Sequence, residues 1–214
     1  MTKLSLHKVL KNGYAKDKEQ RLNGYILDKS LSNDFHQTYY HPQKKKLLYN
    51  VRGTQPTNLG DWITDAKLFF GKGFKESDRY KEAHKGLRDA KAKYGTDSAS
   101  VVGHSLGGQI ANYIAGGKDK VITLSKAATF GSSLRGGTHY RNQGDIVSSL
   151  DIGKTHTKTL SNENKGGVLK TLGKAALAVA TGNPVLAVAT AKEAVGHVLD
   201  AHKVDNLKDK PIFV

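Results

Sequence analysis

The chain has 214 residues, which suits one domain with a substantial core, and 37% of them are hydrophobic, as in globular proteins. It contains no cysteine, which excludes disulfides, thiolate metal sites and cysteine nucleophiles. The 34 lysines and arginines exceed the 19 acidic residues by 15, and this excess favours polyanions, either nucleic acid or an anionic lipid surface. Residues 1–20 are too polar for a signal peptide or a membrane anchor, so we expect a soluble or peripheral membrane protein.

The first half of the chain predicts strands followed by helices. Residues 1–34 are polar and weakly periodic, which indicates an irregular or partly helical N-terminal arm. Two strands are expected at 38–40 and 47–51, and a short helix or ordered cap at 61–70. Between 75 and 94 the apolar residues recur at intervals of three and four, which predicts an amphipathic helix that ends at Gly95.

The second half continues the alternation. We expect a strand at 99–102, a helix that ends at Gly116, strands at 121–124 and 127–130, and a loop over 153–168. Strands that alternate with helices indicate a mainly parallel sheet with helices on both faces. The predicted fold class is therefore α/β, in a single domain over residues 1–214.

An apolar segment stands apart at residues 173–199. No charge occurs from Ala175 to Ala191, but Gly182-Asn183-Pro184 interrupts the run, which is short for a membrane span. The pattern predicts two short helices in a hairpin. Such a hairpin would pack into the core, or form a lid or lipid-facing element, and a membrane span is the third alternative.

The stretch Val101-Val102-Gly103-His104-Ser105-Leu106-Gly107-Gly108 matches the nucleophile elbow, a Gly-x-Ser-x-Gly turn between a strand and a helix. On such a corner the serine hydroxyl projects into a cleft. The helix N-terminus behind it offers N–H groups to a developing oxyanion. The motif therefore predicts that Ser105 is a catalytic nucleophile and that the chain is an enzyme.

A serine nucleophile needs an acid and a base, which follow it in that order in α/β-hydrolases. The acid candidates are Asp145 and Asp151, and the base candidates after them are His156, His197 and His202. His104 adjoins the serine, but the rigid turn should point its side chain away from Ser105. The oxyanion hole would combine the N–H groups of Leu106 and Thr54. Thr54 lies just after the strand that is expected to end near Val51.

Several blocks together resemble the class 3 (fungal-type) lipases: Arg52-Gly53-Thr54, Asp61-Trp62-Ile63-Thr64-Asp65, Gly103 to Gly108, and Thr129-Phe130-Gly131-Ser132. The resemblance implies an α/β-hydrolase fold and Thr54 as the oxyanion donor. It favours Asp145 as the acid and His202 as the base, with His197 in reserve. Ser133 and Ser148 stand where the family often has proline, and the alanine-rich region is unlike the usual family sequence.

These features predict a serine carboxylic-ester hydrolase that acts on lipids, a lipase or a phospholipase A-type enzyme, and that needs no metal or organic cofactor. The charge favours a phospholipid at an anionic membrane surface over neutral fat. One alternative is a non-catalytic basic protein that binds or disrupts membranes on a hydrolase scaffold. The other is a nucleic-acid-binding or structural assembly component, for which the charge is the support.

Overall fold

A computed structural model describes residues 3–54, 74–127, 136–145, 148, 157–161, 193, 196–197 and 199–214. Within these residues eight strands form one sheet in which spatial order follows chain order. Strands β1 to β4 pair antiparallel, and β4 to β8 pair parallel. The strands are β1 (Arg21–Leu22), β2 (Tyr25–Leu27), β3 (His36–His41), β4 (Lys46–Val51), β5 (Ser100–His104), β6 (Lys120–Leu124), β7 (Thr138–Asn142) and β8 (Thr157–Leu160).

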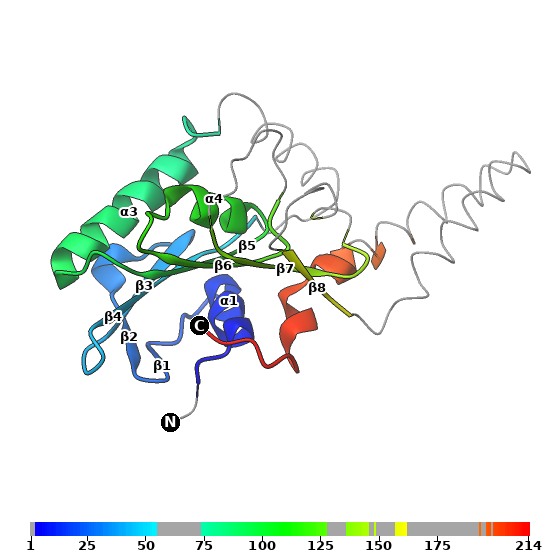
Figure 1. Cartoon of the computed structure of the whole chain (residues 1–214), viewed down its shortest axis with the longest axis horizontal. Helices are drawn as coiled ribbons and strands as arrows, with labels where there is room; N and C mark the ends of the chain where they lie inside the picture. Colours follow the sequence, from blue (N-terminus) through cyan, green and yellow to red (C-terminus); the bar gives the residue numbers. More distant parts are fainter. Residues whose placement is uncertain are drawn as a thin grey trace, which may run out of the picture.

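Helices lie on both faces of this sheet (Figure 1). One face carries the α-helices α3 (Asp78–Tyr94) and α4 (Leu106–Ile114), and the other carries α1 (Leu6–Tyr14) and the 3-10 helix η2 (Val204–Leu207). A second 3-10 helix, η1 (Lys29–Leu31), precedes β3. The sequence expectation of an α/β fold, with a mainly parallel sheet between helices, is confirmed.

The two faces have separate hydrophobic cores because side chains alternate along each strand. On β5, Val101 packs with the core beneath α3 and α4, whereas Val102 packs with the core beneath α1 and η2. Both valines are fully buried. Neighbouring residues of β5 therefore pack against helices on opposite faces of the sheet. This packing on both faces fixes the orientation of β5.

Local sequence explains where α3 begins and ends. The Ser77 hydroxyl accepts a hydrogen bond from the Tyr80 N–H at 3.3 Å, which caps the first turn. Gly95 follows the last turn with φ +59°, a left-handed conformation that glycine adopts at low cost. These signals are local, and the predicted helix over 75–94 matches the observed one to within three residues at its start.

The segment expected over 1–34 as an irregular or partly helical arm contains α1, and Leu6, Val9 and Leu10 of this helix are buried in the core beside the sheet. One other expectation needs correction, and one strand was missed. The expected loop over 153–168 contains strand β8, and β7 was not predicted. Both strands are polar and half-exposed over much of their length, so they lack the apolar alternation that marks a strand.

Other expectations lie outside the described residues. These are the helix or cap at 61–70, most of the strand at 127–130, and residues 173–192 of the apolar hairpin. Among the residues that the structure does describe, helices long and apolar enough to cross a membrane are absent.

Candidate active site

Ser105 occupies a strained corner between β5 and α4. Its φ of 57° and ψ of −128° lie in a region that non-glycine residues rarely adopt, as a nucleophile elbow requires. A Cβ atom on Gly103 would lie 2.4 Å from the Gly107 oxygen, and one on Gly107 would lie 2.2 Å from the Val51 oxygen. The two glycines of the motif are therefore needed, because the turn brings backbone against backbone.

The loop after β4 lies directly against this corner. A Cβ atom on Gly53 would lie 2.9 Å from the Ser105 Cβ, so the loop backbone passes beside the serine. Thr54 follows, and its hydroxyl accepts a hydrogen bond from Arg79 at 3.3 Å. Leu106 is the first residue of α4, where N–H groups have no partner within a helix. Of the predicted oxyanion residues, Leu106 thus follows Ser105 directly in the chain, and Thr54 lies in the loop whose backbone passes beside the serine.

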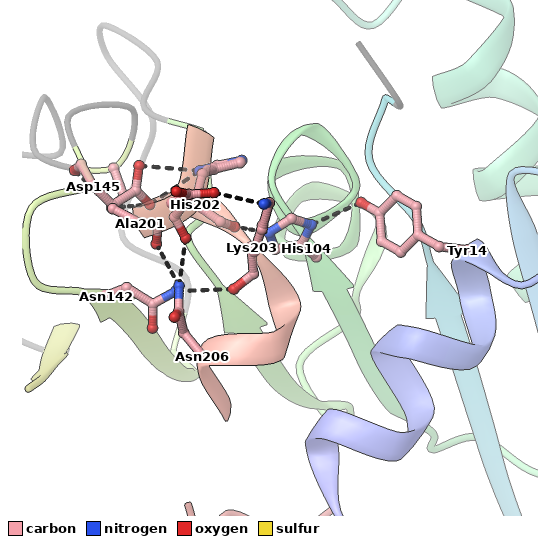
Figure 2. A network of polar contacts seen from close by, with 10 residues as sticks. Tyr14, His104, Asn142, Asp145, Ala201, His202, Lys203 and Asn206 are labelled. Carbon is pink, nitrogen blue, oxygen red and sulfur yellow. Dashed lines mark hydrogen bonds and ion pairs between the residues drawn. The ribbon is translucent and has the colours of Figure 1, made fainter. Parts of the chain in front are cut away.

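Asp145 and His202 are in contact (Figure 2). The His202 Nδ1 lies 3.0 and 3.1 Å from the two carboxylate oxygens of Asp145. Because an ionised carboxylate only accepts hydrogen bonds, Nδ1 carries a proton, and Nε2 is the nitrogen that is left to act as a base. The contact orients the imidazole with its basic nitrogen on the opposite side from Asp145.

The electrostatics of Asp145 match this geometry. Burial raises the pKa of the Asp145 carboxyl. Hydrogen bonds from His202 and Ser148 lower this pKa by more than burial raises it, so the net pKa lies below its ordinary value. The Ser148 hydroxyl donates to Oδ2 at 2.9 Å. Asp145 is therefore ionised at neutral pH although its side chain is buried, and it stabilises positive charge on the neighbouring imidazole.

His202 lies beside the elbow rather than far from it. Its ring is 4.8 Å, centroid to centroid, from the ring of His104, the residue that precedes Ser105. The His104 side chain contacts Tyr14 and the His202 backbone, as Figure 2 shows. The structure thus brings together the elbow, the acid and the histidine that the resemblance favoured.

A cavity of about 500 Å³ opens beside these groups. Its described lining combines Thr54 and the two histidines with both charged and apolar side chains from α1 and the C-terminal segment. The lining residues are Lys11, Tyr14, Thr54, His104, Leu199, His202, Lys203, Val204 and Asp205. A substrate bound there would lie against both the predicted oxyanion loop and the predicted base.

The other candidates lie elsewhere. His197 Nε2 is 3.7 Å from Glu193 of the preceding helical turn, and His156 and Asp151 lie outside the described residues. Tyr14 and Arg79 contact the predicted oxyanion loop, but the sequence did not mark either as a site residue. Neither residue belongs to a motif, so their contacts follow only from the fold.

Solved lipase structures are similar to this chain. The Lip2 lipase from Yarrowia lipolytica has 16% identity and a TM-score of 0.47, over 72% of this chain and 76% of that one. The triacylglycerol lipase from Penicillium expansum has 14% identity and a TM-score of 0.38, over 73% and 76% of the two chains. The likeness concerns the fold and assigns no residue a role. No family model and no curated protein matches the chain.

In the described ranges, groups of three or more His, Cys, Asp or Glu side chains that could hold a metal ion are absent. The groups that surround Ser105 are the His202 imidazole, the Asp145 carboxylate and backbone N–H groups. The chemistry that they can perform is proton transfer, attack by a hydroxyl and stabilisation of an anion.

Proposed function

We propose that the chain is a serine carboxylic-ester hydrolase that acts on lipids, as a lipase or a phospholipase A-type enzyme. The observation that carries the proposal is the contact between His202 and Asp145 beside the Ser105 elbow. The Gly-x-Ser-x-Gly pattern alone also occurs in ordinary glycine-rich turns. An elbow with a carboxylate-oriented imidazole next to it has the parts of a Ser-His-Asp triad in the chain order of α/β-hydrolases.

The mechanism follows from the orientation of each group. Ser105 Oγ attacks the acyl carbonyl carbon while His202 Nε2 takes the hydroxyl proton, and Asp145 stabilises the imidazolium that forms. The N–H groups of Leu106 and Thr54 donate to the oxyanion of the tetrahedral intermediate. The intermediate collapses as His202 returns the proton to the leaving alkoxide oxygen, which releases the alcohol and leaves an acyl-enzyme on Ser105.

Water completes the turnover. His202 Nε2 accepts a proton from a water molecule that attacks the acyl carbon, and a second tetrahedral intermediate forms in the same oxyanion hole. Its collapse expels the Ser105 alkoxide, which recovers the proton from His202. The products are a carboxylic acid and the regenerated serine, and each step uses only groups of this chain and water.

The direct test is labelling with a fluorophosphonate probe together with fatty-acid release from phospholipid vesicles and triacylglycerol emulsions. We expect the wild-type chain to be labelled and to release fatty acid, and Ser105→Ala to do neither. Ser98→Ala is the matched control, because Ser98 is an exposed serine in the loop before β5. A wild-type chain that is neither labelled nor active on any of these esters would overturn the proposal.

The two ester substrates separate the finer assignments. Release from phospholipid vesicles, but not from emulsions, assigns a phospholipase A-type activity, which the net charge of +15 favours. Release from emulsions assigns a lipase. Vesicle binding that survives in Ser105→Ala, together with an inactive wild type, would favour the non-catalytic membrane-binding alternative.

A further inference from the structure

The peptide group between Arg52 and Gly53 is held at both of its polar atoms. The Gly53 N–H donates to the Tyr14 hydroxyl at 2.8 Å. The Arg52 carbonyl accepts from Arg79 Nη2 at 3.0 Å. Because Thr54 follows this peptide directly, the same two contacts restrict the direction in which the Thr54 N–H points.

The turn that carries His202 is held in a similar way, through its carbonyl oxygens. The His202 carbonyl lies 2.8 Å from His104 Nε2. The next carbonyl, of Lys203, accepts from Asn142 Nδ2 at 3.3 Å, and that of Ala201 accepts from Asn206 Nδ2 at 3.2 Å. Three successive carbonyls of the turn are therefore bonded to side chains (Figure 2).

His104 joins the two parts, and the direction of its hydrogen bonds follows from its partners. The His202 carbonyl can only accept, so His104 Nε2 carries the proton. Burial lowers the pKa of His104 to about 3, so its ring is neutral and Nδ1 is an acceptor. The Tyr14 hydroxyl therefore donates to Nδ1, at 2.7 Å, and accepts from Gly53.

We propose that Tyr14 and His104 are positioning residues that hold the oxyanion loop and the base-bearing turn in one fixed arrangement around Ser105. The bonds run from the Gly53 N–H through the Tyr14 hydroxyl and the His104 ring to the His202 carbonyl. This inference rests on the proposed function. Ester hydrolysis needs the donor and the base at set distances from the same serine, and an error of one ångström costs much of the rate.

Helix α1, which ends at Tyr14, also contacts the segment that carries His202. His7 and Lys11, which share that face with Tyr14 by their spacing of four and three, contact Asp205 Oδ1 at 3.2 and 2.6 Å. Asp205 follows His202 by three residues. Along this one face, helix α1 thus contacts the base-bearing segment through His7 and Lys11 and the oxyanion loop through Tyr14.

Tyr14→Phe tests the proposal because it keeps the ring and removes the hydroxyl. We expect kcat per active site to fall about tenfold, since two partly buried hydrogen bonds are lost, with KM changed little. The rate of fluorophosphonate labelling should fall in parallel. Tyr49→Phe is the matched control, because it removes a buried tyrosine hydroxyl away from the site, which donates to the Ala83 carbonyl at 2.9 Å.

His104 variants test whether the two residues act together. Glutamine keeps an N–H donor near the Nε2 position, whereas asparagine is too short to reach the His202 carbonyl. We expect about a tenfold loss of kcat in His104→Asn and partial recovery in His104→Gln. The double variant with Tyr14→Phe should lose no more than the worse single variant, because both changes break one chain of bonds.

The outcomes separate this inference from the proposed function. If the wild-type chain is labelled and active, and Tyr14→Phe lowers the melting temperature as Tyr49→Phe does but keeps full kcat, the positioning role is refuted while the hydrolase stands. Losses in Tyr14→Phe and His104→Asn that multiply in the double variant would also refute it. A wild-type chain that is inactive and unlabelled overturns both.

Discussion

Asp145→Asn should remove nearly all activity while leaving the fold intact. Both carboxylate oxygens lie close to the His202 Nδ1, at 3.0 and 3.1 Å. Either orientation of an asparagine amide would therefore place its NH2 group against the Nδ1–H. The imidazole would move its proton to Nε2, and that nitrogen could no longer accept the proton of Ser105.

The expected magnitude follows from this change of tautomer. We expect kcat to fall by about 10³ to 10⁴, which corresponds to roughly 4–5 kcal/mol in the activation free energy, with little change in KM. The assay is ester hydrolysis with active-site titration, together with thermal unfolding to show that the variant is folded. Ser148→Ala is the control, since it removes one donor to Asp145 Oδ2 but keeps the carboxylate.

If folded Asp145→Asn keeps more than about a tenth of the wild-type kcat, Asp145 is not the acid that orients the base. Asp151→Asn gives the complementary result. Near-complete loss of activity there, with Asp145→Asn still active, would move the acid to Asp151. Ser148→Ala should cost about tenfold or less, because one neutral hydrogen bond to the acid is lost.

Two further results are expected. In Gly107→Ala the new methyl group would lie 2.2 Å from the Val51 backbone oxygen. We therefore expect the free energy of unfolding, measured in urea, to fall by about 3 kcal/mol or more. The control Gly117→Ala should be near neutral, because its methyl group would meet nothing within 4 Å. Equal stability of the two variants would contradict the tight elbow. Burial lowers the pKa of His36 to about 4, below its ordinary value, so the unfolded chain binds protons first as the pH falls. The contribution of His36 to the free energy of unfolding should be fully present above about pH 6.5 and lower by roughly 2–3 kcal/mol at pH 4.5. In His36→Phe, urea unfolding at these two pH values should show a smaller difference in stability.

The elbow could be predicted from the sequence because its requirements are local. Gly103 and Gly107 are needed where backbone meets backbone, and a strand and a helix must flank them. The pairing of Asp145 with His202 is different, since 57 positions separate them. Residue types left Asp151, His156 and His197 open, and the family resemblance favoured the pair that the structure places in contact.

The links around the site could not be predicted in this way. Tyr14 and His104 meet across 90 positions, and a tyrosine at the end of an amphipathic helix carries no sequence signal of that contact. The same holds for β7 and β8, whose strand character depends on pairing with β6 and with each other rather than on apolar alternation. Tertiary contact decided these elements, and local propensity did not.

The docking of α1 against the C-terminal segment has a consequence for how the protein is made. His7 and Asp205 are 198 positions apart, and the Leu6 N–H bonds to the Ile212 carbonyl at 2.9 Å. During synthesis on the ribosome, α1 emerges well before the segment around Asp205 and Ile212. The elbow can form earlier, but His202 takes its place beside the elbow only when that later segment packs against α1. The nascent chain should therefore fold most of its sheet before His202 and Asp145 come into contact.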